Sequence, residues 1–401
     1  MSLFDKYKSL SAQYDAILSA GGDPFGVCMD EVVSATRARV GGREIVLAGT
    51  NNYLGLTFDP ACVEAACEAT RREGTGTTGS RFANGTYGSH RKLERVLGDF
   101  LGFAHCVVFS TGYQANLGAI SGLAGADDVI LLDADSHACI YDGCRLSAAT
   151  TVRFRHNSPE DLDKRLSRLG PEVKGKLVIV EGIYSMFGDV APLAELVDVT
   201  KSHGGYIYVD EAHSFGVFGE GGRGVAEAQG VLDKVDFYAG TFSKSLASIG
   251  GYCASNHPEF ELLRCVMRPY MFTASLSPAN VAGVAAAVGE IARRDELRKQ
   301  IWQNSRRLHK GLTEQGFDIC APAGPIIAIR MPDVETAVLR WNRLLEEGVY
   351  ANLAIPPGTP NNTSLIRLSV SAAHTPDDID FICNALARTQ NAAPDMAVAT
   401  T

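Results

Sequence analysis

The feature that most constrains this fold is an alternation of short apolar runs with helical patterns between about residues 60 and 270. Helical patterns such as "SPEDLDKRLSRLG" and "LAELVDVTKSHG" lie between the apolar runs. The alternation predicts an α/β fold with a mostly parallel central sheet and helices on both faces. In such sheets ligands bind at the carboxyl ends of the strands. The strand candidates are "CVVFS" (106–110), "DVILLD" (128–133), "KLVIVEG" (176–182), "GYIYVDEAH" (205–213) and "DFYAGTF" (236–242).

The sequence on either side of this alternation predicts further parts of the fold. Residues 1–40 have an amphipathic helical pattern in "LFDKYKSLSAQYDAILSAG", which ends at "GGDP". The segment "REIVLAGTNNYLG" (43–55) predicts a short strand that enters a turn. A long helical stretch at 279–316 leads into a smaller α+β region, and the tail from residue 389 is expected to be disordered. The expected domains are an N-terminal helical arm with a short strand (1–50), a large cofactor-binding domain (51–285) and a small C-terminal domain with the disordered tail (286–401).

Composition excludes several classes of protein. The net charge of −9 argues against bulk binding to nucleic acid. The ten cysteines include no CxxC pair, so neither a zinc site nor a disulfide scaffold is expected, and no metal is predicted. No run of 18 apolar residues and no signal-peptide core are present in the sequence. We therefore expect a cytoplasmic protein without a transmembrane segment, which still allows peripheral contact with a membrane.

Polar and reactive side chains follow several of the strand candidates. Asp210 ends the apolar run in "YVDEAH", and His213 follows it in the same motif. Lys244, in "GTFSKSL", lies beyond the next strand candidate, and His137, in "DADSHACIYDG", lies beyond another. Because the carboxyl ends of parallel strands meet at one edge of a sheet, we expect these side chains to lie close together.

A phosphate site is predicted at the same edge of the sheet. Gly112 and Tyr113, in "STGYQANLG", lie at a strand-to-helix turn whose free N–H groups suit a phosphate. Thr241 and Ser243 add hydroxyl donors beside Lys244. An acid, a lysine, an imidazole and a phosphate cradle are what pyridoxal 5'-phosphate requires: the lysine forms a Schiff base and the acid keeps the pyridine nitrogen protonated.

Each of these residues also has a simpler interpretation when it is taken alone. Asp210 could cap a helix, Lys244 could face solvent in a loop, and His137 could be a hydrogen-bonded core imidazole. Their order on successive strands favours the cofactor site over these separate roles. The motif "GEGGRG" (219–224) fits the dinucleotide fingerprint G-x-G-x-x-G, but it does not directly follow a strand. We interpret it as a glycine-rich active-site loop.

Long blocks of the chain resemble the α-oxoamine synthase family of fold-type I pyridoxal phosphate enzymes. They include "TNNYLGLTFDP", "GTGTTGSRFANGTYGSHRKLE", "FSTGYQANLG", "VRFRHNS", "EGIYSMFGDVAPL" and "VDEAHSFGVFG". Within that family, "DADSHACIYDGC", "RPYMFTASLSP" and "PPGTP" favour the bacterial members that act on L-serine and palmitoyl-CoA. The resemblance covers nearly the whole chain and implies a fold-type I transferase with a mostly parallel central sheet.

The resemblance also implies a role for individual residues. Lys244 would form the Schiff base and move the α-proton, Asp210 would pair with the pyridinium nitrogen, and His213 would hydrogen-bond the phenolic oxygen. His137 would stack on the ring and contact the substrate carboxylate. Residues beside the phosphate or the ring would be Gly112, Tyr113, Ser185, Thr241 and Ser243, with Thr273 and Ser275 from a second subunit. Such a shared site implies a homodimer.

The implied reaction is a decarboxylating condensation of L-serine with palmitoyl-CoA that gives 3-ketodihydrosphingosine, CoA and CO2. Three alternatives stay open. A related synthase would use glycine or alanine with a different acyl-CoA. An aminotransferase or β-lyase would use pyridoxal phosphate without acyl transfer, and a regulatory subunit would lack catalysis, although Lys244 argues against that last class. Whether an acyl carrier protein replaces CoA is left open by the sequence.

One position departs from the pattern of the family. Ile355, in "YANLAIPPGTP", stands where those relatives tend to carry an arginine that helps to bind the substrate carboxylate. Arg367, in "LIRLSVS", remains as a candidate for that role, because a guanidinium can hold a carboxylate with two parallel hydrogen bonds. Asn51, in "TNNYLG", is the other residue that the resemblance places at the substrate.

Overall fold

The computed structural model describes residues 2–19 and 22–390, which form two compact units. The larger unit consists of residues 51–185 and 189–300, and the smaller unit consists of residues 1–50, 186–188 and 301–401. The N-terminal segment thus groups with the C-terminal region. The expected boundary at residue 285 lies inside helix α10 (Pro278–Arg293), whereas the observed division falls after residue 300.

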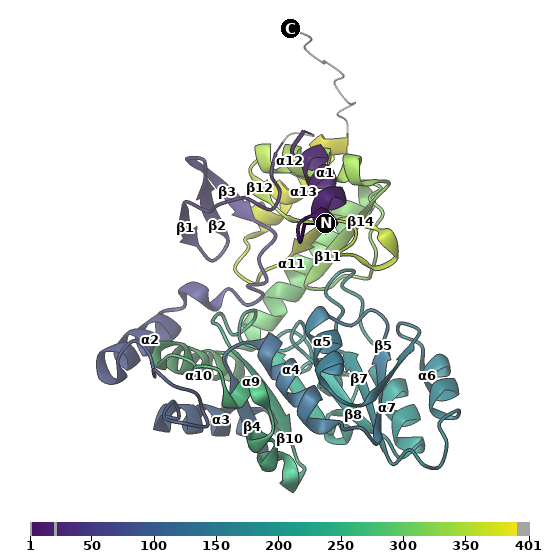
Figure 1. The fold of residues 1–401 in the computed structure, drawn as a ribbon. Helices are drawn as coiled ribbons and strands as arrows, with labels where there is room; N and C mark the ends of the chain where they lie inside the picture. The colour runs from purple at the N-terminus through teal and green to yellow at the C-terminus, as the bar shows by residue number, and fades with distance from the viewer. Residues whose placement is uncertain (1, 20–21, 391–401) are drawn as a thin grey trace. The chain divides into compact units, whose positions relative to one another are not determined.

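A seven-stranded sheet forms the centre of the larger unit, in the order β4-β10-β9-β8-β7-β5-β6 (Figure 1). Neighbours from β9 to β6 run parallel, and β10 runs antiparallel to both β9 and β4. The predicted mostly parallel sheet is confirmed. Its strands are β4 (His105–Phe109), β5 (Asp128–Asp133), β6 (Thr150–Phe154), β7 (Gly175–Glu181), β8 (Tyr206–Asp210), β9 (Phe237–Thr241) and β10 (Gly251–Ser255).

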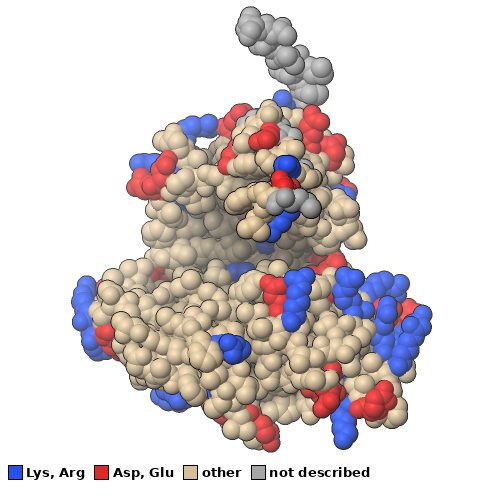
Figure 2. Space-filling model, viewed as in Figure 1, with Lys and Arg blue, Asp and Glu red and all other residues tan. Residues whose placement is uncertain are grey.

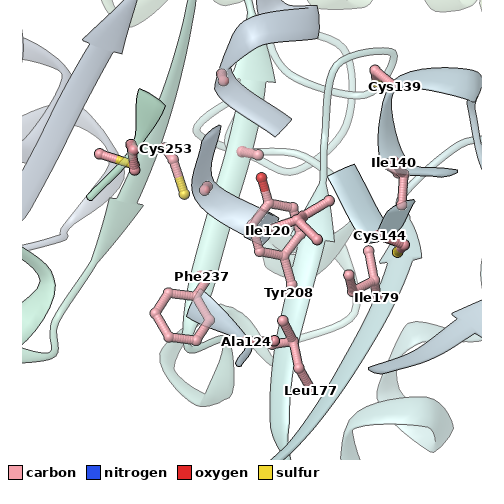
Figure 3. Packing of buried hydrophobic residues seen from close by; sticks show 14 of the residues in the cluster. Ile120, Ala124, Cys139, Ile140, Cys144, Leu177, Ile179, Tyr208, Phe237 and Cys253 are labelled. Carbon is pink, nitrogen blue, oxygen red and sulfur yellow. The ribbon is translucent and has the colours of Figure 1, made fainter. Parts of the chain in front are cut away.

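Apolar side chains cover both faces of this sheet, which explains why its central strands are continuous apolar runs. On one face, alternate side chains of the strands form a hydrophobic cluster with Ile120 and Ala124 of the α4 segment. Figure 3 shows Leu177, Ile179 and Tyr208 in this cluster. The helices of the larger unit are α2 (Pro60–Glu73), α3 (Gly88–Leu101), α4 (Gly112–Leu123), α5 (Ala138–Leu146), α6 (Pro159–Leu166), α7 (Leu193–Ser202), α8 (Val225–Ala228), α9 (Arg268–Met271) and α10, with 3-10 helices η2 (Leu56–Phe58), η3 (Leu232–Lys234) and η4 (Pro258–Cys265).

The smaller unit contains two further sheets. One has the order β1-β2-β3-β12 and the other the order β11-β14-β13. Their strands are β1 (Glu31–Ser34), β2 (Arg37–Val40), β3 (Arg43–Leu47), β11 (Ile326–Met331), β12 (Val349–Tyr350), β13 (Asn352–Ala354) and β14 (Ser364–Ser369). The helices that belong wholly to this unit are η1 (Asp5–Tyr7), α1 (Lys8–Ser19), α12 (Val334–Glu346), η5 (Pro360–Asn362) and α13 (Pro376–Gln390).

Three predictions about these outer elements were wrong in part. The helical interpretation of residues 1–40 holds for η1 and α1, but β1 and β2 form an antiparallel pair in which the β-branched "EVVS" faces "RARV". The helical stretch at 279–316 is two helices, α10 and α11 (Asp295–Glu314), because Arg294 leaves helical geometry at φ −117° and ψ 74°. Of the tail expected to be disordered, residues 389–390 end α13, and the rest lies outside the described residues.

Within the described ranges, no helix is both long and apolar enough to cross a membrane.

A buried ionic network connects α3 to η4 in the larger unit. The Glu94 carboxylate lies 2.9 Å from Arg81 Nη2 and 3.0 Å from Arg264 Nη1, and these side chains are between 3% and 11% exposed. The ring of Tyr270 lies 5.4 Å and 5.5 Å from the two guanidinium carbons. Because the two cations share one carboxylate, loss of Glu94 would leave buried positive charges without their common partner.

We expect Glu94→Ala to destabilise the protein by about 3 kcal/mol, the scale for breaking a buried pair, and to lower Tm by roughly 6 °C. Glu64→Ala is the matched control, because Glu64 pairs with Arg71 where both side chains are more than half exposed. That change should alter Tm by less than about 2 °C. Thermal unfolding of both variants would measure this, and equal Tm shifts would contradict a special role for the buried network.

Candidate active site

A cavity of about 360 Å³ opens at the carboxyl ends of the central strands of the larger unit. It brings together most of the residues that the sequence predicted for a cofactor. Its lining consists of Thr111, Gly112, Tyr113, Asn116, His137, Cys139, Glu181, Asp210, Ala212, His213, Gly240, Thr241, Ser243, Lys244, Ile249 and Gly250. The segments after β4, β5, β8 and β9 contribute, together with Glu181 at the end of β7, as the parallel sheet requires.

One wall of the cavity can hold an anion. Helix α4 begins at Gly112, its N-cap Thr111 accepts a hydrogen bond from Gln114 N at 3.1 Å, and its first-turn N–H groups lack partners within the helix. A Cβ atom on Gly112 would lie 2.7 Å from the Thr241 side chain, so only glycine fits here. The hydroxyls of Thr241 and Ser243 lie 2.9 Å apart beside this turn. Helix N–H groups and hydroxyls together suit a phosphate.

Asp210 is a buried carboxylate with hydrogen bonds that hold it as an acceptor. Its side chain is 5% exposed, and it accepts from Asn116 Nδ2 at 2.6 Å and from Ala212 N at 2.9 Å. Asn116 is itself fixed by the Tyr208 hydroxyl, which donates to Asn116 Oδ1 at 2.7 Å. A carboxylate held in this way can bind a cationic N–H group of a ligand.

His213 is connected to Asn51 through a hydroxyl group that the sequence analysis missed. The hydroxyl of Tyr53 lies 2.6 Å from His213 Nδ1 and donates to Asn51 Oδ1 at 3.3 Å. Asn51 does not line the cavity, whereas His213 does. Asn51 and Tyr53 both lie in the "TNNYLG" block. Tyr53 could have been identified from the sequence, because it lies two positions after Asn51, a predicted substrate residue.

His137 is the N-cap of α5, and its ring faces the cavity as a neutral acceptor. Its Nδ1 accepts from Cys139 N at 3.2 Å, which places the ring proton on Nε2. Burial lowers the pKa of His137; the charge of Asp210 opposes this shift and that of Lys244 reinforces it. The ring of Tyr113 meets the His137 ring edge to face at 6.4 Å. The hydroxyl of Tyr113 donates to Asp142, which raises the pKa of Tyr113.

Glu181 is a second buried carboxyl in the cavity wall. It ends β7 opposite Asp210 in the parallel ladder, is 3% exposed, and accepts a hydrogen bond from His137 N. Burial raises the pKa of Glu181 well above its ordinary value, and the nearby Asp210 charge acts in the same direction. Burial therefore disfavours the ionised form of Glu181.

Lys244 lies in a tight loop that follows β9. Ala247 N donates to Lys244 O at 2.9 Å, and Ser248 N donates to Phe242 O at 2.9 Å. Ala247 has a φ of 51°, a left-handed conformation that alanine rarely adopts. The loop thus holds the lysine backbone at the edge of the sheet, and its half-buried side chain lines the cavity. A primary amine there can form a Schiff base with a carbonyl group.

Several expected site residues do not line the cavity. Ser185 lies in the loop after β7, and Thr273 accepts from Gln114 Nε2 at 3.2 Å. Ser275 hydrogen-bonds Thr77 and Gly85, both at 2.6 Å. Arg367 lies on β14 of the smaller unit, where it is 6% exposed and donates to Ser369 Oγ at 3.2 Å.

The loop at residues 219–224 does not line the cavity, contrary to its interpretation as an active-site loop. Its N–H groups are taken up by a carboxylate of the same unit, because Glu227 accepts from Gly221 N and Arg223 N. Gly219, Gly222 and Gly224 all have positive φ values near 80–89°. The glycines therefore allow a tight turn before α8.

Asn116, Cys139 and Glu181 line the cavity but were missed by the sequence analysis. Asn116 lies four residues after Gly112 and so shares its helix face, a spacing that could have identified it. Glu181 lies at the end of a predicted strand, as Asp210 does, so the same reasoning could have identified it. Cys139 has no such signal; burial raises the pKa of its thiol, as does the charge of Asp210.

Comparison with known proteins agrees with this arrangement. Residues 43–386 match the model of the family "Aminotransferase class I and II". The chain is 54% identical to serine palmitoyltransferase of Caulobacter vibrioides, with 95% of each chain covered, and 49% identical to that of Sphingomonas paucimobilis, covering 95% of this chain and 91% of the relative. A solved serine palmitoyltransferase with the PLP internal aldimine superposes with a TM-score of 0.95 at 48% identity, covering 97% and 98% of the two chains.

The chain therefore belongs to the class I and II aminotransferase family. The predicted fold-type I architecture is confirmed by this match and by the superposition. Within the family, its relatives place it in the branch of the bacterial serine palmitoyltransferases, so the predicted resemblance is confirmed as well.

We expect Gly112→Ala to weaken binding of pyridoxal phosphate at least tenfold, or about 1.4 kcal/mol, because the added methyl group moves Thr241 and the anion cradle. Titration of the cofactor-free protein, followed by absorbance, measures this affinity. Gly289→Ala is the control, because a Cβ on Gly289 of α10 meets no atom within 4 Å. Unchanged affinity in the Gly112 variant would argue against a phosphate at the N-terminus of α4.

Proposed function

We propose that this protein catalyses the pyridoxal phosphate-dependent condensation of L-serine with palmitoyl-CoA, giving 3-ketodihydrosphingosine, CoA and CO2. The observation that carries the proposal is the single cavity in which Lys244, Asp210, His137 and the N-terminus of α4 converge. The names of relatives that match over nearly the whole chain support the same reaction. In this reaction a bond forms between serine Cα and the acyl carbon, while the CoA thiol and CO2 leave.

The residues of the cavity fit this cofactor. The α4 N-terminus, Thr241 and Ser243 would hold the phosphate, and the narrow space at Gly112 would bring backbone close to it. Asp210, fixed as an acceptor by Asn116, would bind the protonated pyridine nitrogen. His213 would hydrogen-bond the phenolic oxygen, supported from behind by the Tyr53 hydroxyl.

Pyridoxal phosphate supplies an electron sink for the electron pair that remains when serine Cα loses its proton. The Lys244 amine would hold the cofactor aldehyde covalently and, once serine has replaced it, would move the proton at Cα. The neutral His137 ring would pack on the cofactor and orient the serine carboxylate with its Nε2–H. Glu181 lies beside Asp210 in the cavity wall, where burial raises its pKa and so disfavours a second negative charge.

We propose that the active enzyme is a homodimer in which Thr273 and Ser275 reach the phosphate of the other subunit. Near these residues, Phe82 is 55% exposed and Phe272 is 70% exposed, and the isolated bridge between Ser80 and Ala274 joins their segments. Figure 2 shows that the surface around α3 and α9 is mostly uncharged but is interrupted by Lys and Arg side chains. Exposed apolar surface of this kind is typical of a face covered by another subunit.

We also propose a cytoplasmic location. All ten cysteines are free, including the cavity residue Cys139, and reduced thiols are typical of the cytosol.

The proposed reaction is tested by mass spectrometry of the products that the holoenzyme forms from palmitoyl-CoA with serine, glycine or alanine. We expect 3-ketodihydrosphingosine from serine, and loss of essentially all turnover in Lys244→Ala, because no other cavity amine can form the Schiff base. Preferred turnover of glycine or alanine would assign the protein to another synthase of the family. Turnover of the amino acid without any acyl-CoA would indicate an aminotransferase or lyase.

Arg367 is our proposed ligand for the serine carboxylate, given its match to the family pattern and the isoleucine at position 355. We expect Arg367→Ala to raise the KM for serine at least tenfold, about 1.4 kcal/mol, with cofactor binding intact. Ile355→Arg is the companion variant and should change serine affinity much less. Spectral titration of the holoenzyme with serine measures both effects. Normal serine binding by the Arg367 variant would move the role to His137 or Asn51.

A further inference from the structure

A histidine outside the cavity joins the loops that follow β5, β6 and β7, and the β5 loop leads to the cavity residue His137. His156 follows β6, and its Nδ1 lies 2.8 Å from Asp133 Oδ1, while its Nε2 lies 2.7 Å from Asp189 Oδ2. Asp133 is fully buried at the end of β5, and Asp189 lies in the loop after β7. The ring of Tyr184, from that same loop, meets the imidazole edge to face at 4.4 Å.

This geometry calls for an imidazolium. Both ring nitrogens face carboxylate oxygens, and only the doubly protonated ring can donate to both. The ionisable groups around the ring are Asp133 and Asp135 from the β5 segment and Asp189 and Tyr184 from the β7 loop. Burial acts to lower the pKa of His156, but the hydrogen bonds to Asp133 and Asp189 outweigh burial and raise the pKa of His156 to about 10.

The carboxylates that bind His156 also shape the backbone that carries His137. Asp133 Oδ1 accepts from Asp135 N at 2.9 Å, and Ser136 N donates to Asp133 O at 3.2 Å, so this turn ends at His137. On the other side, Tyr184 N donates to Asp189 O at 3.0 Å, and the Tyr184 hydroxyl lies 3.4 Å from Glu181 N. Glu181 in turn accepts from His137 N.

We propose that His156, held as a cation between Asp133 and Asp189, is a positioning residue that sets the place of the His137 ring in the cavity. It acts by joining the loops after β5, β6 and β7, and it contacts neither cofactor nor substrate itself. The proposal rests on the proposed function only in assigning His137 to the cofactor ring and the serine carboxylate. The charge state and the loop geometry can be tested without that reaction.

The experiment compares His156→Gln with His203→Gln. His203 is a matched control, because its Nε2 lies 2.7 Å from Asp163 and its side chain is as exposed as that of His156, at 23%. We expect His156→Gln to lower kcat at least about tenfold through a displaced His137. The visible circular dichroism of bound pyridoxal phosphate should change with it, and His203→Gln should leave both unchanged. A folded His156 variant with unaltered kcat and dichroism would overturn the proposal.

A second variant keeps the test decisive if His156→Gln does not fold. Asp189→Asn preserves the shape and the acceptor oxygen but removes one of the two charges. In NMR titration of the cofactor-free protein, we expect wild-type His156 to keep both ring protons until the pH approaches about 10. The Asn variant should lose one of them at least about one pH unit lower. A neutral His156 in the wild type at pH 7 would overturn the proposal.

The same charge predicts a pH-dependent stability. A histidine whose pKa is raised on folding stabilises the protein fully below its unfolded pKa of about 6.5, and this contribution disappears as the pH rises through the folded pKa. The Tm difference between wild type and His156→Gln should therefore be largest near pH 6 and shrink toward the folded pKa of about 10. If the dichroism and NMR results hold while no condensation product forms, the proposed reaction fails and the positioning role stands.

Discussion

The parallel hydrogen-bonded ladder of β5, β7, β8 and β9 is the constraint on which the candidate site depends. Its register ends the strands at one edge, with Glu181 directly opposite Asp210. Because every strand in this part runs the same way, each following loop begins at that edge. The antiparallel β10 then brings Gly251 against Gly112, at the start of α4, and so closes the anion cradle.

Crowding of carboxyl groups is the electrostatic consequence of this register. Asp133, Glu181 and Asp210 end three neighbouring strands and are all at most 5% exposed. Each is held differently: Asp133 by hydrogen bonding to His156, Asp210 by the Asn116 amide and a backbone N–H, and Glu181 by the His137 N–H, with a pKa that burial raises. Asp210 and Glu181 line the cavity, and Asp210 is the carboxylate that we assign to a cationic ring nitrogen.

The cavity is lined by residues of the larger unit of one chain, and we propose that a second subunit adds Thr273 and Ser275 to it. Thr273 and Ser275 hydrogen-bond within their own chain, next to exposed apolar side chains such as Phe272. A polar segment flanked by uncovered aromatic rings is more economically explained by a partner surface than by solvent. The exposed rings beside Thr273 and Ser275 therefore support the homodimer proposal.

The sequence by itself determined five of the seven central strands and half of the sixteen residues that line the cavity, because buried parallel strands leave continuous apolar runs and their last residues can be read directly. Asp210, His137, Lys244 and Gly112 were identified in this way. Strands β6 and β10 were not predicted, since β6 is an edge strand with exposed positions and β10 contains mostly small residues.

Only the tertiary structure decided which side chains meet across loops. The contact between Tyr53 and His213 joins residues 160 positions apart, and the His156 clamp joins three loops that no local pattern relates. The motif at 219–224 matches a ligand motif locally, but in the fold its Gly221 and Arg223 N–H groups donate to Glu227. Periodicity and strand-end chemistry are local and therefore visible in the sequence. Charge pairing and ring placement depend on the register of distant segments, which only packing sets.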